Sequence, residues 1–353
     1  MKISSFVFLL SLIFCTSFSG CDNTNCTETT WYLDADGDGL GDPDVSQIAC
    51  DQLAGYVENS DDTDDSGGVV TKAVDPALFL TSGVTITTEP CTLSDGTVTS
   101  CYKFVTTSVP ADHDMGPWCP TNISDDASAG GIWIENGEVY DVDGAFVQNM
   151  ASFYSDSKWL MYDSNGDIYV TETEADCIAA ANPNVGVEYE NFCVECLPAY
   201  VTSITQTYYI PISPVELATP YTFAMGPGTT SVRGIAFNGV RFDAPAPTGA
   251  ILGAYTLAPF DDAGGHINHN AGYHYHAATG VSTTYEQTDS HGGMIGYALD
   301  GYGIYEQLDK DGTEPTDLDA CRGHYDQVRG YHYHVAAPGT NSFINCLNGA
   351  YVK

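Results

Sequence analysis

The stretch GGHINHNAGYHYHAA, residues 264–278, decides the fold, because it returns as RGHYDQVRGYHYHVAA at residues 322–337. Upstream, GIAFNGVRF at residues 234–242 matches GYALDGYGI at residues 296–304. Both pairs occur in the same order, which predicts a duplicated half-domain. The two repeat units span residues 233–278 and 295–337, approximately. Two such copies often pack about a pseudo-twofold axis, so we expect equivalent histidines to be brought toward each other.

Each copy contains the pattern G-H-x5-G-Y-H-Y-H. Tyrosine favours strands, and successive side chains of a strand point to opposite faces. His274 and His276 therefore share one face, and the tyrosines beside them share the other. The same arrangement recurs at His332 and His334. Two imidazoles on one strand face can chelate a transition metal, and neutral imidazole suits zinc, copper, nickel and iron.

Histidines are concentrated in this region, since eight of the nine lie between residues 266 and 334. The candidate metal ligands here are His266, His274, His276, His291, His324, His332 and His334. The six repeated histidines exceed one mononuclear site, so either two sites form or some histidines orient ligands or transfer protons. For proton transfer the candidates are His291 and Asp300. The alternative is a buried hydrogen-bond network of Tyr and His without a metal.

From residue 70 onward the sequence predicts a mainly β fold with few short helices. Runs of Val, Ile, Thr, Tyr and Phe are broken at short intervals by Gly, Pro, Asn and Asp, which is typical of short strands joined by turns. The expected strands include SGVTITTEP, CYKFVTTSV, GGIWIENG, SKWLMYD and SITQTYYIPI. One segment, TEADCIAAANP, is expected to form a helix.

A small acidic module is expected at residues 22–66, followed by a linker at residues 67–74. It contains WYLDADGDGLGD at residues 31–42 and NSDDTDD at residues 59–65. Carboxylates on alternate positions of a glycine-rich loop can surround a calcium ion. The loop is not an EF-hand, because Val45 stands where the bidentate Glu belongs. The expected calcium ligands are Asp34, Asp36, Asp38, Asp42, Asp61, Asp62, Asp64 and Asp65. The alternative is a solvated acidic linker.

The first 20 residues have the layout of a secretory signal, with Lys2 before an apolar run. Ser19, Gly20 and Cys21 then look like a lipobox, so we expect Cys21 to be lipidated, with simple signal cleavage as the alternative. No later stretch reaches the roughly 20 apolar residues of a membrane helix. The protein is thus expected to be exported and attached to the bacterial cell envelope or cell surface through its lipid alone.

The formal net charge of −37 excludes nucleic acid and anionic lipid as natural partners, because both would be repelled. The same charge attracts cations, although it also serves solubility.

Twelve cysteines, less Cys15 in the signal and Cys21, leave ten in an exported protein, and an even number favours disulfides. We expect the local pairs Cys26–Cys50, Cys91–Cys101 and Cys321–Cys346, and we leave Cys119, Cys177, Cys193 and Cys196 unassigned. The C-x-x-C formed by Cys193 and Cys196 is expected to be a structural disulfide, because no second C-x-x-C is present to complete a zinc site.

These motifs resemble the bacterial YHYH-domain family over roughly residues 75–350. The resemblance also rests on CTLSDGTVTSCYKF, PADHDMGPWCP, YYIPISPV, FNGVRFDAPAP, GYALDGYGIYE and LDACRGHYD. It implies that His113 joins the metal ligands. Ala263 stands where the second copy has Cys321, which argues against a cysteine ligand in the first copy. The segment from Trp31 to Asp65 resembles thrombospondin type 3-like repeats, which implies calcium binding.

Three functions fit these observations. The first is an envelope protein that binds copper or zinc, with copper ahead because H-x-H pairs, abundant tyrosine and an oxidising compartment suit it; storage or oxidative chemistry would fit. The second is a zinc-dependent hydrolase, although H-E-x-x-H and G-x-S-x-G are absent from the sequence. The third is a calcium-stabilised adhesion module without catalysis, whose tyrosine-rich faces bind a glycan or protein at the cell surface.

Overall fold

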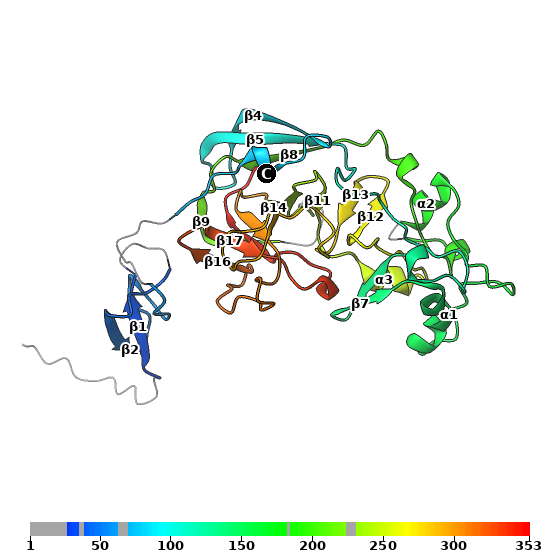
Figure 1. Ribbon diagram of the computed structural model, residues 1–353, viewed down its shortest axis with the longest axis horizontal. Helices are drawn as coiled ribbons and strands as arrows, with labels where there is room; N and C mark the ends of the chain where they lie inside the picture. The colour runs from blue at the N-terminus through cyan, green and yellow to red at the C-terminus, as the bar shows by residue number, and fades with distance from the viewer. Residues whose placement is uncertain (1–26, 35–38, 63–69, 182–183, 224–230) are drawn as a thin grey trace, which may run out of the picture. The chain divides into compact units, whose positions relative to one another are not determined.

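The computed structural model describes residues 27–34, 39–62, 70–181, 184–223 and 231–353. The chain divides into two compact units, Met1–Gly68 and Val69–Lys353 (Figure 1). The expected signal peptide and the lipidated Cys21 lie outside the described residues, so both stay predictions.

The first unit contains a three-stranded antiparallel sheet in the order β2-β1-β3. Its strands are β1 (Thr29–Leu33), β2 (Ser46–Ala49) and β3 (Tyr56–Val57). Trp31 on β1 is buried and donates its indole N–H to Ala49 O at 3.2 Å. The unit therefore has a small core of its own.

The second unit is built on an eight-stranded mixed sheet. Across the sheet the strands are β12 (Gly265–Asn268), β13 (Gly272–Tyr275), β11 (Arg241–Phe242), β10 (Gly234–Ala236), β14 (Met294–Ala298), β15 (Gly303–Tyr305), β17 (Gly330–His334) and β16 (Gly323–Asp326). The mainly β fold is confirmed.

The order of these strands is symmetric about the β10–β14 pair. At that pair Ile235 is registered with Tyr297, the residue 62 positions later, which is also its match in the sequence repeat. In both halves, a hairpin of two outer strands carries the histidine motif, and its inner strand pairs in parallel with the next strand. That the halves arose by duplication stays a prediction.

The strand registers place the histidines of both motifs on the same face of the sheet. Phe242 shares a face with Tyr275, so Arg241 shares the opposite face with the histidines of β13. Residues that are registered on neighbouring strands lie on the same face of the sheet. This face therefore runs from Arg241 across Ile235, Tyr297 and Gly303, and it reaches the histidines of β17. Five strand spacings of about 4.8 Å separate β13 from β17, so the two motifs lie roughly 24 Å apart along the sheet.

Smaller sheets and helices surround this framework. Further strands are β4 (Val84–Thr92), β5 (Val98–Thr106) and β8 (Gln206–Pro211) in one sheet, the hairpin of β6 (Ile132–Glu135) and β7 (Glu138–Asp141), and the pair of β9 (Glu216–Thr222) and β18 (Cys346–Gly349). Helices are α1 (Gly144–Phe153), α2 (Glu174–Ala180) and α3 (Thr248–Gly253), with 3-10 turns η1 (Pro76–Leu78), η2 (Ala127–Ala129), η3 (Val187–Tyr189), η4 (Pro198–Tyr200) and η5 (Pro338–Thr340).

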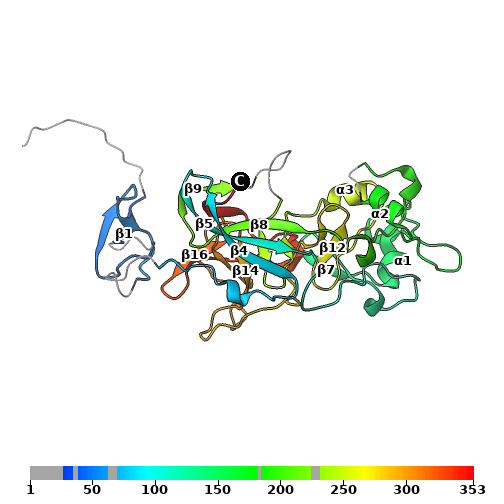
Figure 2. The same cartoon turned by 90° about the horizontal axis from the view of Figure 1, so that it is seen from above.

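These elements cover different parts of the large sheet. Figures 1 and 2 show the β4-β5-β8 sheet over the centre of the unit, the three α-helices at the end beside β12, and β16 with β17 at the other end. Phe104 and Ile210 of the small sheet are fully buried in one hydrophobic cluster with Ile235. A second cluster gathers Trp133 and Met150 beside the helices. The first cluster thus spans both halves of the large sheet, and the second packs beside it.

Some predicted elements differ from the structure. The helix expected in TEADCIAAANP is confirmed as α2. A capping box fixes its start, in which Thr173 and Asp176 each bond the other's backbone N–H. The strand expected in SKWLMYD is wrong, because that segment contributes only an isolated bridge at Tyr162. Helix α1 was not expected; Asp143 caps it, and it buries Val147.

The described part of the chain contains four disulfides. Cys91–Cys101 and Cys321–Cys346 are confirmed. The unassigned Cys193 and Cys196 are disulfide-bonded as expected of the C-x-x-C, but to Cys119 and Cys177 respectively and not to each other. Cys26, the partner expected for Cys50, lies outside the described residues.

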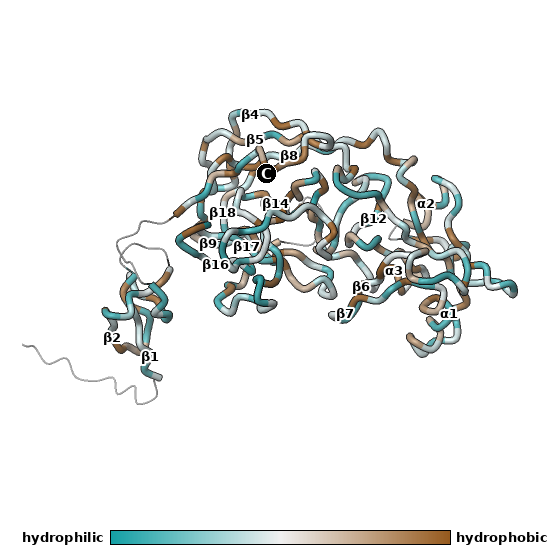
Figure 3. The backbone as a smooth tube through the Cα atoms, in the orientation of Figure 1, coloured by the Kyte–Doolittle hydropathy of each residue, from teal (hydrophilic) through white to brown (hydrophobic). Residues whose placement is uncertain are grey.

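In the described part of the chain, no helix is long and apolar enough to cross a membrane. Figure 3 agrees, since hydrophilic and hydrophobic residues alternate along its coloured segments.

Candidate metal centre

The histidines gather into two separate groups on the large sheet. The four-histidine cluster consists of His291, His324, His332 and His334, and the three-histidine cluster consists of His266, His274 and His276. Within each cluster, one ring nitrogen of every member lies within 4.8 Å of the others. The expectation that the copies bring their histidines together is wrong, because the strands that carry them lie at opposite ends of the sheet.

In the four-histidine cluster, every imidazole directs its Nδ1 to an oxygen acceptor. These pairs are His291 with Gly292 O at 2.9 Å, His332 with Gly330 O at 2.7 Å, His334 with Glu306 O at 2.7 Å and His324 with Asp317 Oδ1 at 2.9 Å. A carbonyl or carboxylate oxygen only accepts hydrogen bonds, so each Nδ1 carries the proton. A neutral imidazole has one such proton, which leaves a lone pair on every Nε2.

The four Nε2 atoms point at one another. The contacts are 2.8 Å between His291 and His332, 2.9 Å between His324 and His332, and 3.1 Å between His291 and His334. These contacts cannot all be hydrogen bonds, because the Nε2 atoms carry no protons when the Nδ1 atoms hold them. Lone pairs that face each other repel unless a cation lies between them.

A positive charge on the rings does not resolve this conflict. Burial lowers the pKa of His291, holds that of His332 well below its ordinary value, and lowers that of His334 to about 4. A second proton is therefore unfavourable near neutral pH on these three rings.

A transition-metal ion between the four Nε2 atoms resolves the repulsion of their lone pairs. At a metal–nitrogen distance of about 2.0–2.1 Å, tetrahedral nitrogens lie about 3.3 Å apart. The observed contacts are slightly shorter, so the residues fit the group.

The three-histidine cluster repeats this arrangement with one ligand fewer. His274 Nδ1 faces Gly272 O at 3.0 Å, and His276 Nδ1 faces Ala244 O at 2.7 Å. The Nε2 atoms of His266 and His276 lie 3.2 Å apart.

Burial keeps the rings of this cluster neutral as well. It holds the pKa of His266 and of His274 well below the ordinary value, and it lowers that of His276 to about 4. The Nδ1 acceptors leave the Nε2 lone pairs of His274 and His276 free, and His266 offers a third ring nitrogen within 4.8 Å, so the three residues could hold an ion in an incomplete shell.

The comparison with known families falls on this region. Residues 207–317 match the protein family described as YHYH protein. The matched stretch contains the first Tyr-His-Tyr-His motif and His291, and it ends before His324. No curated protein and no solved structure matches the chain. The resemblance of residues 31–65 to thrombospondin type 3-like repeats stays a prediction.

The first YHYH motif opens onto a cavity of about 390 Å³. Asp243 on its wall lies 4.0 Å from His274 Nε2, forms an ion pair with Arg241, and accepts a hydrogen bond from Ala244 N at 2.9 Å. Burial opposes its ionisation, but the charge of Arg241 prevails and lowers the pKa of Asp243. This carboxylate therefore stays ionised beside the imidazoles.

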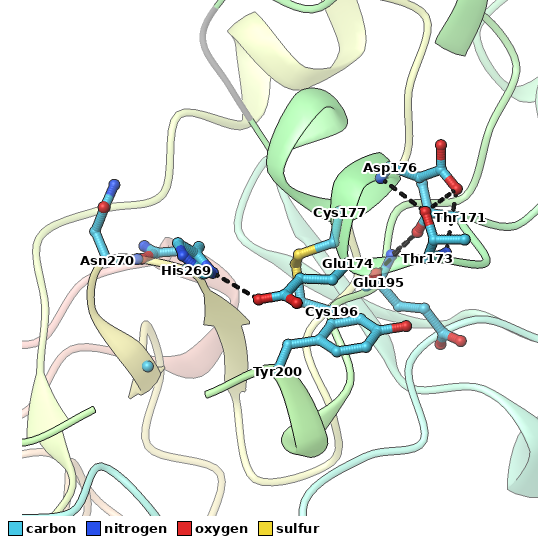
Figure 4. The surroundings of a disulfide bond; sticks show 12 residues. Thr171, Thr173, Glu174, Asp176, Cys177, Glu195, Cys196, Tyr200, His269 and Asn270 are labelled. Atoms are coloured by element: carbon cyan, nitrogen blue, oxygen red, sulfur yellow. Dashed lines mark hydrogen bonds and ion pairs between the residues drawn. A yellow bond between two sulfur atoms is a disulfide. The ribbon is translucent and has the colours of Figure 1, made fainter. Parts of the chain in front are cut away.

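A second carboxyl group, that of Glu195, also lines this cavity. Its backbone is fixed by Thr171, whose hydroxyl donates to Glu195 O at 2.8 Å and accepts from Glu195 N at 3.0 Å (Figure 4). The disulfide Cys177–Cys196 next to it links this segment to α2. Burial raises the pKa of Glu195, and its Oε2 accepts a hydrogen bond from Cys119 N at 3.3 Å.

Tyr273 and Tyr333 of the motifs form buried hydrogen bonds away from the two histidine clusters. Tyr273 donates to Asp261 at 2.8 Å, and Tyr333 donates to Asp300 at 2.6 Å. Asp300 is fully buried, which raises its pKa to about 6. It was expected to assist proton transfer, but it faces Tyr333 and the backbone N–H of Gly349 rather than a histidine.

His113 lies beside the tyrosines of the first motif. Its Nε2 is 3.4 Å from the hydroxyls of both Tyr273 and Tyr275, and its Nδ1 is 2.7 Å from Asp112. The structure does not bring it to either cluster. His269, the histidine left out of the expected ligands, is half-exposed and pairs with Glu174 at 3.6 Å (Figure 4).

The acidic segments of the first unit lie side by side. Gly41 N donates to Asn59 Oδ1 at 3.0 Å, and Asp62 N donates to Gly41 O at 3.1 Å. Of the expected calcium ligands, Asp34, Asp42, Asp61 and Asp62 are described, whereas Asp36, Asp38, Asp64 and Asp65 lie outside the described residues.

Sequence reasoning missed the Arg241–Asp243 pair and Glu195. For Asp243 a signal existed, since it directly follows the repeated segment GIAFNGVRF. Glu195 carries no such signal, because only the folded chain brings its segment to the cavity.

Proposed function

We propose that this protein binds transition-metal ions, copper or zinc, at both histidine clusters. The observation that carries the proposal is the convergence of four unprotonated Nε2 atoms, with contacts of 2.8–3.1 Å, in the four-histidine cluster. Each Nδ1 proton is held by an oxygen, which is how metal-binding histidines are usually oriented. Neutral imidazoles are the form that binds a metal, and burial maintains it.

The two clusters suit different roles. Four nitrogen donors complete a tetrahedral shell, which is typical of a structural or storage site. The three-histidine cluster leaves a position toward the cavity, and an ion there would supply Lewis-acid or redox chemistry to a bound molecule. The carboxyl groups of Asp243 and Glu195 would stand on the wall of the cavity beside it. Oxidative activity at this cluster is the enzymatic form of the proposal.

Copper ranks ahead of zinc in this proposal. Imidazole binds both ions, and for one set of ligands the affinity for copper is the higher. The four disulfides support an oxidising, exported location, where copper(II) persists.

A tyrosine-based adhesion surface finds less support, because Tyr273, Tyr275 and Tyr333 are fully buried.

Elemental analysis of the exported protein tests the proposal. We expect two equivalents of copper or zinc per chain, one of which is lost in His332→Ala/His334→Ala and the other in His274→Ala/His276→Ala. His269→Ala is the matched control, because this histidine lies in neither cluster, and it should retain both. Metal content that none of the substitutions changes would contradict the proposal.

We further propose that the chain is a lipoprotein anchored at Cys21 and that its first unit binds calcium. Support for calcium comes from the contact between Gly41 and the segment at Asn59, which brings the two acidic stretches together. Calcium titration by calorimetry should show binding that Asp42→Asn weakens and the neighbouring Asp44→Asn does not. Equal binding by both variants would oppose this assignment.

A further inference from the structure

The two clusters differ in their surroundings. All three members of the three-histidine cluster line the 390 Å³ cavity. In the four-histidine cluster, His332 lines a smaller pocket of about 240 Å³, and the four ligands already complete a shell. A ligand from solution therefore has a coordination position at the three-histidine cluster.

The wall of this cavity is mostly apolar. Its apolar members include Trp118, Val194, Pro245, Pro247, Ile251 and Pro259. Trp118 is buried and fixed by a hydrogen bond of 3.0 Å from its indole N–H to Gly265 O, so its ring is a rigid surface. An apolar cavity of about 150 Å³ holds one benzene molecule. The cavity here has room for a larger ring-containing ligand.

The charges of the site favour an anionic ligand for the metal ion. The ion pair of Arg241 with Asp243 is neutral as a whole, and imidazole is a neutral ligand, with the Nδ1 protons of His274 and His276 held by backbone oxygens. The carboxyl of Glu195 is held toward its neutral form by burial. A divalent ion bound by the imidazoles would thus keep most of its charge, which an anionic ligand oxygen would balance.

We propose that the cavity binds a small organic anion with a ring-containing apolar body and one carboxylate or phenolate oxygen directed to the three-histidine cluster. This inference rests on the proposed metal binding. The apolar body would pack against Trp118 and Ile251.

Cobalt(II), whose visible spectrum reports its ligands, provides the test. The His332→Ala/His334→Ala variant carries only the three-histidine cluster, and we would titrate its cobalt form with benzoate and with acetate. Benzoate should change the spectrum and bind at least about tenfold more tightly than acetate, because burial of a ring exceeds the 1.4 kcal/mol that a tenfold difference requires. Equal affinities for the two anions would overturn the inference.

Cavity-filling substitutions locate the ligand. Ala258→Phe should weaken benzoate binding by at least about tenfold and leave that of acetate within about twofold, since only the ring needs the space. Ala250→Trp, at an exposed position on the same wall, blocks the cavity without changing the core and decides the matter if Ala258→Phe does not fold. Unchanged benzoate binding in a folded variant would overturn the inference.

The failure of the underlying proposal would look different. If cobalt does not bind to the histidines at all, the proposed metal binding fails. If cobalt binds in one equivalent and benzoate leaves its spectrum unchanged, only the ligand assignment fails.

Discussion

Removal of the metal from the four-histidine cluster should destabilise the second unit strongly. In the metal-free state, buried Nε2 lone pairs face one another at 2.8–3.1 Å, whereas the unfolded chain exposes the same imidazoles to water. The four ligands come from the segment before β14 and from the β16–β17 hairpin, so the ion links parts of the chain 43 residues apart, from His291 to His334.

The magnitude follows from linkage. An ion that binds only the folded state stabilises it by about 4 kcal/mol when its free concentration is 1,000 times Kd. Each kcal/mol shifts Tm by roughly 2–4 °C in a domain of this size class. Removal of one ion should therefore lower Tm by roughly 8–16 °C.

Thermal unfolding followed by circular dichroism, with and without a chelator selective for transition metals, measures this shift. The His274→Ala/His276→Ala variant isolates the contribution of the four-histidine cluster, and calcium is kept in excess so that the first unit stays saturated. Restoring copper or zinc should restore Tm. The reasoning is refuted if the chelator leaves Tm of this variant unchanged while its metal is shown to be removed.

Two further predictions concern buried hydrogen bonds and pH. Tyr333→Phe should reduce the free energy of unfolding in urea by about 1–3 kcal/mol, because it removes one donor of buried Asp300 and the hydroxyl that accepts from Asn348 N. Tyr331→Phe, whose partner carboxylate is exposed, should cost below about 1 kcal/mol, and equal effects would contradict this prediction. In the metal-free protein, burial lowers the pKa of His276 and His334 to about 4. Between pH 4 and about 6.5, the ordinary pKa of histidine in the unfolded chain, the unfolded state therefore binds more protons than the folded state. The free energy of unfolding should fall as pH is lowered through that window. Urea unfolding at a series of pH values checks it, and a flat profile there would contradict the buried placement of these rings.

The histidine pairs could be predicted from local sequence because strand alternation is a local property. His274 and His276 share a face as their spacing requires, and the hairpin turn before them fixes His266 opposite His274. The disulfides Cys91–Cys101 and Cys321–Cys346 were equally accessible, because each closes a short loop.

The division of the histidines into two clusters could not be predicted in this way. It depends on the pairing of β10 with β14, which places both copies of the motif at opposite ends of one sheet. Most acceptors that orient the rings are backbone carbonyls, such as Ala244 O and Glu306 O, which carry no side-chain signal. The cavity wall comes from segments as distant as Trp118, Val194 and Ile251, and only the tertiary fold brings them together.

X-ray absorption spectroscopy of the His274→Ala/His276→Ala variant loaded with copper or zinc tests the central claim most directly, because this variant carries only the four-histidine cluster. We predict one tightly bound ion with about four imidazole nitrogens at about 2.0–2.1 Å. An ion surrounded mainly by oxygen, or none bound after dialysis, would contradict the account.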